Sequence, residues 1–386
     1  MVQPKTGRSY QRPGMAALVA GRSYQRPGMA ALVAGWSCRS PDGPAAEGFL
    51  PYPNAYRKTM NTHSEHEKWM RRCLQIARGG ALHASPNPMV GAVIVCGDRI
   101  LGEGFHACCG KAHAEVNAIR AVREADRALL RESTLYVSLE PCAHYGRTPP
   151  CAELIVRTGI PRVVVGCADP FAKVNGRGID ILRSAGVEVT VGVLEAECLA
   201  LNRTFITAQT LQRPYITLKW AVSADGFIGC WREDAVTACG PVALSSERSL
   251  LRVHHLRTLH DAILVGHTTL LADRPRLTAR LWHGAQPLRL VLGRMSEGEL
   301  PAGFEAYADI DTLLVALHRR GVRSLLVEGG CATLQAFIDR GLWDEAWREL
   351  SPVVIGSGVP GPRMPVGVER EATERFGRTV EHWVNR

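Results

Sequence analysis

Three side chains that bind metals stand at spacings that could build one catalytic site. His113-Ala114-Glu115 lies where a helical pattern begins, and Pro141-Cys142 leads to Cys151 through AHYGRTPP. One histidine and two cysteines leave the fourth position of a tetrahedral zinc ion open for water, as in catalytic zinc sites. Zinc lowers the pKa of that water, and Glu115 can take its proton and pass it to a leaving amine.

The spacing of the two cysteines separates this chain from the common zinc signature of nucleobase deaminases. That signature reads H-x-E followed by P-C-x-x-C. Here the first half is intact, but eight residues stand between Cys142 and Cys151 where the signature has two. Cys108 and Cys109 lie nearer to His113 but have no matching helix context, so we interpret them as structural.

Helical patterns alternate with short β-rich runs around these residues. Ser64-Glu65-His66-Glu67 predicts a capping box at a helix start. The predicted strands are 90–96, 135–139, 162–167 and 187–191. This alternation is typical of an α/β layered domain, which we expect to end near Leu201.

A second α/β domain is predicted after a short linker at 202–212, which lacks glycine and should hold the domains close together. Strands are expected at 215–219, 262–265, 288–292 and 324–327. Helices are expected at 246–258, at 311–320 and from about Ala332.

Composition fits a globular protein of two or three domains, because 46% of the 386 residues are hydrophobic and 22% are charged. The net charge of +9 invites a nucleic-acid or membrane-surface interpretation. Residues 1–59, however, hold eight basic and two acidic residues and so carry +6 of that charge. The near-neutral remainder argues against a nucleic-acid deaminase, and no apolar run is long enough for a membrane span.

Twelve cysteines are too dilute for a disulfide scaffold, so we expect a reducing cytoplasm. The segment GRSYQRPGMAALVA at 7–20 recurs at 21–34 without a substitution and is followed by a Pro/Gly-rich stretch. We interpret 1–59 as a disordered extension or as the product of a start assigned too early, with Met60 as the true start. An organellar transit peptide is the alternative.

Several motifs together resemble the deaminase half of the bifunctional riboflavin-biosynthesis deaminase/reductase family. They are Ser85-Pro86-Asn87-Pro88-Met89-Val90-Gly91-Ala92, Gly102–His106, His113–Glu115 and Glu140–Cys151 with its long cysteine spacing. The resemblance implies a zinc cytidine-deaminase-like three-layer domain. It implies His113, Cys142 and Cys151 as zinc ligands, Glu115 as proton shuttle, and contacts to the substrate's ribose and phosphate from Asn87, His106, His144 and Arg147.

The second domain resembles the reductase half of that family, which has a dihydrofolate-reductase-like α/β fold and uses NADPH. The matching residues include Lys219, Ser223–Gly226, Arg257 and Leu326–Gly330. By this resemblance the substrate residues are Lys219, Arg257, Leu277, Arg280 and Glu328. The cofactor residues are Ala221, Thr269, Asp273, Gly330, Ala332 and Thr333.

Two departures from the family pattern affect the reductase half. Pro241-Val242-Ala243-Leu244-Ser245 replaces a Ser-x-Trp-Ile-Thr run. Between Arg280 and Glu328 we recognise one strand, 288–292, and one helix, as though about thirty to forty residues were missing. Loss of a central strand would leave unpaired backbone groups and impair the reductase.

We therefore expect an extension at 1–59, a deaminase domain at 60–205, and a reductase domain at 213–386 that is shortened between 293 and 311. The expected activities are zinc-dependent deamination of a phosphoribosylamino-diaminopyrimidinone and NADPH-dependent reduction of its ribosyl group. The alternatives are a monofunctional deaminase, a nucleic-acid deaminase and a purely structural zinc. The expected partner is the small phosphorylated pyrimidine, without nucleic acid or membrane, and the sequence leaves a homo-oligomer open.

Overall fold

The computed structural model describes residues 54–145, 149–170, 175–230, 242–296, 298–375 and 377–385. Among these residues, no helix combines the length and the apolar character needed to cross a bilayer. Arg147 and Pro241, which the sequence analysis singles out, lie outside the described residues.

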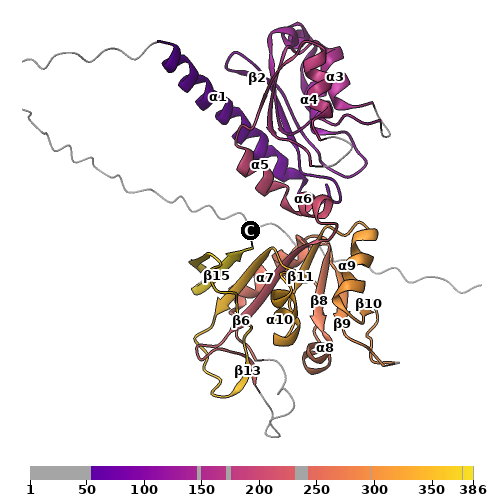
Figure 1. Cartoon of the computed structure of the whole chain (residues 1–386), viewed down its shortest axis with the longest axis vertical. Coiled ribbons are helices and arrows are strands. Elements are labelled where there is room, and N and C mark those ends of the chain that lie inside the picture. Colours follow the sequence, from indigo (N-terminus) through magenta and orange to yellow (C-terminus); the bar gives the residue numbers. More distant parts are fainter. Residues whose placement is uncertain are drawn as a thin grey trace, which may run out of the picture. The chain divides into compact units, whose positions relative to one another are not determined.

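The first domain is built on a five-stranded sheet in the order β2-β1-β3-β4-β5 (Figure 1). β1 (Gly91–Cys96) pairs antiparallel with β2 (Arg99–Phe105) and β3 (Thr134–Leu139), and β3, β4 (Arg162–Cys167) and β5 (Glu188–Val191) are parallel. The carboxyl ends of β3 and β4 therefore meet at one edge of the sheet, where loops can carry functional side chains.

Helices cover both faces of this sheet, because its strands are apolar on both sides. Along β1, Ala92 and Ile94 pack toward α2 (Ala114–Ala121), α3 (Cys151–Thr158) and α4 (Arg177–Ser184). Val93 and Val95 pack on the opposite side toward α1 (Asn54–Ala77) and α5 (Glu195–Leu201). Short 3-10 helices, η1 (Arg78–Gly80) and η2 (Glu124–Glu132), complete the domain. The expected three-layer fold is confirmed.

The structure differs from the sequence analysis of this domain in three places. α1 begins at Asn54, so the residues of the predicted capping box at Ser64 lie inside the helix. In the sequence, the helix-breaking residues Pro51 and Pro53 stand just before this start. β2 was not expected at all. The linker predicted at 202–212 is largely helical, because it contains α6 (Arg203–Thr210).

The second domain contains an eight-stranded sheet in the order β10-β9-β8-β11-β6-β12-β15-β14 (Figure 1). The strands from β10 to β12 are parallel, and β15 and β14 continue the sheet antiparallel. The parallel strands are β10 (Phe304–Tyr307), β9 (Leu288–Leu292), β8 (Ala262–Gly266), β11 (Ser324–Val327), β6 (Tyr215–Val222) and β12 (Glu345–Leu350). The antiparallel ones are β15 (Arg378–Val384) and β14 (Arg370–Arg375), while β7 (Phe227–Cys230) and β13 (Gly358–Pro360) form a separate ribbon.

Both faces of the second sheet are also covered. One carries the larger core, in which Leu313 of α9 (Ile310–Arg319) and Phe337 of α10 (Cys331–Asp339) pack on the strands. On the other, Leu256 of α7 (Glu247–Thr258) and Leu270 of α8 (His267–Asp273) pack against Val265. α7 thus covers the face on which Lys219 lies.

The prediction of a single strand between Arg280 and Glu328 is wrong, because β10 extends the sheet beyond β9. β10 pairs in parallel with β9 from Phe304↔Arg289 to Tyr307↔Leu292. Every neighbouring pair of strands in the eight-stranded sheet is hydrogen-bonded, so the described domain has no central gap of the kind that a lost strand would leave.

Candidate active site

Three elements bring the predicted zinc ligands together. His113 precedes α2 as its N-cap residue, Cys142 follows the strand end of β3, and Cys151 is the first residue of α3. His113 Nδ1 lies 3.5 Å from Cys142 Sγ and 3.4 Å from Cys151 Sγ. Among the described residues this is the one group of three or more such side chains that could hold a metal ion.

The geometry of this group fits zinc. Zinc–nitrogen bonds of about 2.0–2.1 Å and zinc–sulfur bonds of about 2.3 Å at tetrahedral angles place ligand atoms about 3.5 Å apart. The observed separations of 3.5 and 3.4 Å agree with that value. In addition, the Cys151 backbone N–H donates to Cys142 Sγ at 3.3 Å, and hydrogen bonds from Cys151 and His113 lower the pKa of the Cys142 thiol. A thiolate is the form that binds the metal.

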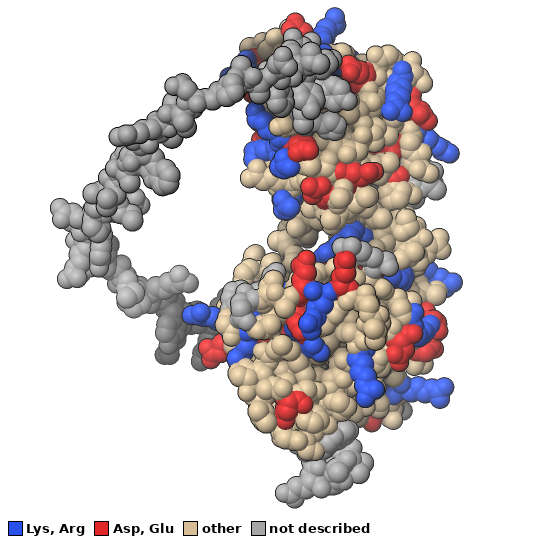
Figure 2. Space-filling model, turned by 60° about the vertical axis from the view of Figure 1, so that its left-hand side comes forward, with Lys and Arg blue, Asp and Glu red and all other residues tan. Residues whose placement is uncertain are grey.

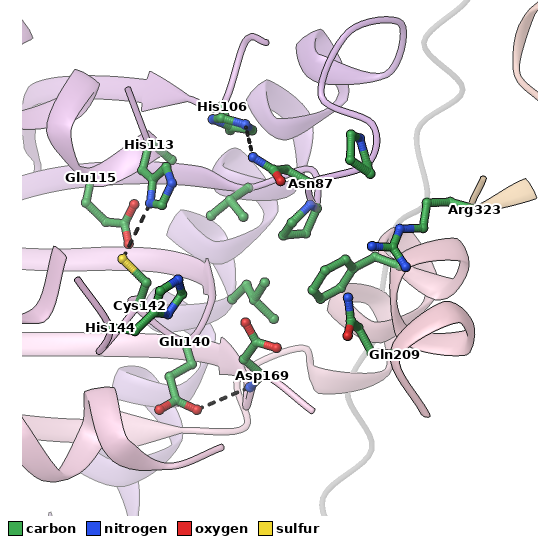
Figure 3. Close-up of a pocket in the computed structure, with 16 residues that line it drawn as sticks. Asn87, His106, His113, Glu115, Glu140, Cys142, His144, Asp169, Gln209 and Arg323 are labelled. Atoms are coloured by element: carbon green, nitrogen blue, oxygen red, sulfur yellow. Dashed lines mark hydrogen bonds between the residues drawn. The ribbon is translucent and has the colours of Figure 1, made fainter. Parts of the chain in front are cut away.

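Glu115 faces the same group from the first turn of α2 (Figure 3). Its side chain is buried, with 3% exposure. Burial, and secondly the neighbouring Cys142 sulfur, raises the pKa of its carboxyl to about 7. A carboxyl group in such an environment can both accept and release a proton near neutral pH.

A buried glutamate fixes the loop that carries Cys142. The Glu140 carboxylate accepts hydrogen bonds from four backbone amides: Oε1 from Gly178 (2.9 Å) and Ile179 (3.4 Å), and Oε2 from Gly176 (3.0 Å) and Asp169 (3.2 Å). A Cβ at Gly178 would lie 2.0 Å from the Pro141 carbonyl oxygen, so this position has room only for glycine. The loop at β3 and the start of α4 are thereby tied together.

A cavity of about 310 Å³ opens next to the metal-binding group (Figure 3). Asn87, His106 and His144 line it, as the sequence resemblance implies. His106 Nδ1 lies 3.2 Å from the Ala112 carbonyl oxygen, which can only accept, so Nδ1 carries the proton. His106 Nε2 therefore accepts from Asn87 Nδ2 at 3.1 Å. Burial lowers the pKa of His106, which favours this neutral form.

Sequence reasoning missed several residues that line the same cavity. Asp169 follows β4, Gln209 lies in α6, and Arg323 precedes β11. Figure 3 shows the side chains of Gln209 and Arg323 on the side of the cavity away from Cys142. A signal existed for Asp169, because it stands just beyond the carboxyl end of a parallel strand. Gln209 and Arg323 belong to no recognisable motif.

In the second domain, the structure joins two of the five predicted substrate residues, Arg257 and Glu328, by direct hydrogen bonds. Arg257 donates to both oxygens of Glu328, at 3.2 and 2.6 Å, and to the carbonyl of Thr278 at 3.0 Å. It thus fixes the segment that contains the buried Leu277. Lys219 is close enough for Glu328 to raise the pKa of its ammonium, although burial lowers that pKa more strongly. Arg280 is exposed at the end of the same segment.

Four of the six predicted cofactor residues, Thr269, Gly330, Ala332 and Thr333, lie near the starts of α8 and α10. A Cβ at Gly330 would lie 2.8 Å from Thr269 Oγ1, and one at Gly266 would lie 2.3 Å from Thr333 Oγ1. Such close backbone approach at the N-terminus of α10 suits a pyrophosphate group. Ala332 is in the first turn of α10, Asp273 ends α8 with its carboxyl pKa raised by burial, and Ala221 lies in β6.

Family models match both domains. Residues 63–167 match the cytidine and deoxycytidylate deaminase zinc-binding region, and residues 214–376 match the RibD C-terminal domain. The first match spans His113, Cys142 and Cys151, and the second spans the eight-stranded sheet up to β14 and the helices that cover it.

Known proteins are similar over most of the chain. The riboflavin biosynthesis protein RibD of Aquifex aeolicus is 36% identical over 325 residues, covering 76% of this chain and 88% of that protein. RibD of Escherichia coli is 31% identical over 353 residues, covering 80% and 93%. The chloroplastic riboflavin biosynthesis protein PYRD of Zea mays is 42% identical over 289 residues, covering 67% and 70%.

A solved structure shares both the fold and the order of domains. The Thermotoga maritima diaminohydroxyphosphoribosylaminopyrimidine deaminase/5-amino-6-(5-phosphoribosylamino)uracil reductase superposes with a TM-score of 0.74 at 32% identity. The match covers 84% of this chain and all of that one. Together with the metal-binding group and the two matched domains, these similarities show that the chain belongs to the RibD family of bifunctional riboflavin-biosynthesis deaminase/reductases.

Proposed function

We propose that this enzyme deaminates 2,5-diamino-6-(5-phosphoribosylamino)pyrimidin-4-one at the first domain and reduces the ribosyl group of the product to ribityl at the second, with NADPH as reductant. The observation that carries this proposal is the arrangement of His113, Cys142 and Cys151 around one point, with Glu115 beside them at the wall of a 310 Å³ cavity. The T. maritima protein that this chain resembles is named for the same two reactions.

In the deaminase site, His113, Cys142 and Cys151 would hold zinc, which supplies a water of lowered pKa when it is bound. Glu115 would take the proton of the attacking water and deliver it to the leaving amine. Because Asn87 donates to His106, its carbonyl oxygen is left for a donor on the substrate. His144 and Arg147 would contact the ribose and phosphate from the loop after Cys142.

In the reductase site, Lys219, Arg257, Leu277, Arg280 and Glu328 would bind the ribosyl phosphate substrate. Ala221, Thr269, Asp273, Gly330, Ala332 and Thr333 would line the cofactor. The close approach of Gly330 to Thr269 supports this assignment, because a bulkier residue would fill the space at the helix start.

The domain limits remain part of this proposal: an extension at 1–59, a deaminase at 60–205 and a reductase at 213–386, shortened between 293 and 311. Since β10 completes the hydrogen-bonded sheet in that region, the shortening would fall in loops and not in the sheet. We also propose that the protein acts in the cytoplasm. Mass spectrometry of its native N-terminus tests whether residues 1–59 are present in the cell or are removed as a transit peptide would be.

Incubation of the purified protein with the deaminated intermediate and NADPH tests the bifunctional assignment. We expect loss of NADPH absorbance in this incubation, and release of ammonia in a parallel incubation with the diamino substrate. Intact deamination without NADPH consumption would favour the monofunctional alternative. Figure 2 shows basic and acidic side chains interspersed on the visible face, which gives no support to a nucleic-acid substrate.

A further inference from the structure

Two adjacent parallel strands of the second domain place Lys219 and Glu349 on the same face of the sheet. Trp347 of β12 pairs with Lys219 of β6, and Glu349 pairs with Ala221. Side chains two residues apart in a strand share a face. Lys219 and Glu349 are therefore diagonal neighbours on the face that α7 covers.

A small space lies between this face and α7, lined by residues of both. Its volume is about 20 Å³, which is enough for about one water molecule and too little for a substrate or a dinucleotide. The residues around it include Lys219, Ser249, Arg252, Trp347 and Glu349. The substrate cannot enter this space, so a side chain that acts within it acts on its neighbours there, among them Lys219.

Glu349 is buried, with 5% exposure, yet only one of its carboxylate oxygens has a hydrogen bond within the described residues. Oε2 accepts from Ser245 Oγ at 2.9 Å. Oε1 has no hydrogen-bond partner there, and Arg378 Nε lies 3.8 Å away, beyond hydrogen-bonding distance. An incompletely satisfied buried carboxylate is costly, so its presence calls for a reason.

Other buried glutamates of the same sheet are fully engaged. Glu345, also in β12, accepts from Arg203 and Thr217 through Oε1, and its Oε2 lies 3.3 Å from His382. Glu381 in β15 is held by Arg348 and Arg370, one on each oxygen. Glu349 thus differs from both, because one of its carboxylate oxygens has no hydrogen bond among the described residues and its side chain lines the small space beside Lys219.

Lys219 is the residue on which this carboxylate can act. It is one of six lysines in the sequence and the only one after Lys173, where every other basic side chain apart from histidine is an arginine. An ammonium can release a proton in a buried site, whereas a guanidinium does not. Two anions, Glu328 and Glu349, lie near Lys219 and favour its charged form. Two cations, Arg257 and Arg252, also lie near it and disfavour that form. Arg257 lies 2.6 Å from Glu328, whereas the ion pair of Glu349 with Arg378 is longer, at 3.8 Å, so Glu349 is the less closely compensated anion.

We propose that Glu349 is a positioning residue of the reductase reaction, which holds the Lys219 ammonium charged and directed toward the ribosyl ring oxygen. This rests on the reductase function proposed above. In that reaction a hydride from the reduced nicotinamide adds to the ribosyl carbon that bears the amine. The bond from this carbon to the ring oxygen breaks with its electron pair on oxygen, and Lys219 delivers the proton that makes this oxygen a hydroxyl. The nicotinamide is oxidised by two electrons.

Glu349→Gln tests this role, because it removes the charge and keeps an oxygen that can accept from Ser245. A unit charge at the roughly 7–8 Å of a diagonal pair, at an effective dielectric constant of about 20, changes the pKa of a neighbouring group by about one pH unit or more. In a pH profile of NADPH oxidation with the deaminated intermediate, we expect the alkaline limb of E349Q to move down by about one pH unit. We also expect kcat to fall about tenfold, while deamination is unchanged.

Glu345→Gln is the matched control, since it makes the same change on the same strand and face. By register Glu345 is the other diagonal neighbour of Lys219, but Arg203 and His382 lie against its carboxylate and compensate its charge. The alkaline limb of E345Q should coincide with that of the unchanged enzyme. An alkaline limb of E349Q that also coincides with that of the unchanged enzyme would overturn the proposal, whatever the change in kcat.

A readout that does not need turnover separates this inference from the reductase function itself. With only six lysines, the Lys219 signal can be assigned in the full chain by NMR of labelled lysine side chains, with Lys219→Arg as the reference. E349Q should lower the pH at which the Lys219 signal titrates. An unchanged titration would refute the role of Glu349 even if NADPH oxidation fails in the unchanged enzyme and the proposed function falls with it.

Discussion

Replacement of Glu140 by glutamine should loosen the zinc site without touching a zinc ligand. The Glu140 carboxylate accepts from the amides of Asp169, Gly176, Gly178 and Ile179, two on each oxygen. Whichever oxygen becomes an NH2 group, two backbone N–H groups lose their acceptor and face a donor.

The magnitude follows from those two contacts. A hydrogen bond to a charged group contributes about 1.5–3 kcal/mol, and one bond of each pair is long, at 3.2 or 3.4 Å. We therefore expect a loss of about 3 kcal/mol, which is a large part of the 5–15 kcal/mol that stabilises a typical protein. If about half of this free energy is lost from the conformation of the Pro141-Cys142 loop that binds zinc, zinc affinity should fall about tenfold. If all of it is, the affinity should fall about 100-fold.

The assay is zinc transfer from the purified full chain to a chromophoric chelator, run beside thermal unfolding of the zinc-loaded protein. Glu132→Gln, a similar change at an exposed residue, is the control and should behave like the unchanged protein. A zinc affinity and an unfolding temperature in E140Q that match those of the control would show that the four amides do not hold the loop.

Further predictions concern the deaminase, the pairing of a strand with a helix, acid stability and the reductase. Glu115→Gln should keep zinc, measured by metal analysis, and abolish ammonia release; retained activity would contradict its role as proton shuttle. Gly104→Ala should destabilise the first domain by several kcal/mol in denaturant unfolding, because a Cβ would lie 2.3 Å from the Ala118 amide and 2.5 Å from the Ala114 carbonyl oxygen. Hydrogen bonds from the Ser223 side chain and from backbone amides lower the pKa of Asp225 from 3.8 to about 2. The ionised carboxylate therefore stabilises the fold above about pH 4, and this contribution is lost as the pH falls toward 2. Asp225→Asn should flatten acid unfolding over that range, and an unaltered acid profile would count against it. Arg257→Lys should lower NADPH oxidation at least tenfold and spare deamination, since lysine cannot make both bonds to Glu328; equal losses in both activities would indicate a general folding defect.

The sequence was informative where chemistry and periodicity coincide in one stretch. His113, Glu115, Cys142 and Cys151 could be assigned to one site because helix starts and strand ends flank them, and strands such as 162–167 and 288–292 match the structure residue for residue. The family and its two activities are confirmed by the comparisons, and the three-layer fold of the first domain is confirmed by the structure.

Strands that break the apolar pattern could not be recognised in the same way. β2 contains Gly102 and Gly104, which resemble loop residues in sequence but are required because α2 packs directly on them. β12 and β15 carry a half-buried Arg348 and a buried Glu381, which form an ion pair across the two strands. Their polarity conceals two interior strands, because such an ion pair can be recognised only when both partners are seen together.

The wall of the deaminase cavity was the hardest part to predict. Gln209 and Arg323 come from segments far from the zinc motif, and only the fold brings them to it. The sequence-based boundary at residue 205 cut through α6 and therefore left Gln209 outside the domain whose cavity it lines.

The linker helix also determines where the two activities could be separated. The side chain of Asn202 clamps Met89 through both its backbone N–H (2.8 Å) and its carbonyl (3.0 Å), while the next residue, Arg203, pairs with Glu345 of β12. Consecutive residues thus belong to different halves of the enzyme. A deaminase expressed alone would need to retain α6 to keep Phe205 and Gln209 in its cavity, and that helix would then carry an unmatched arginine. A practical cut therefore falls between Thr210 and Pro214, combined with replacement of Arg203 by a neutral residue.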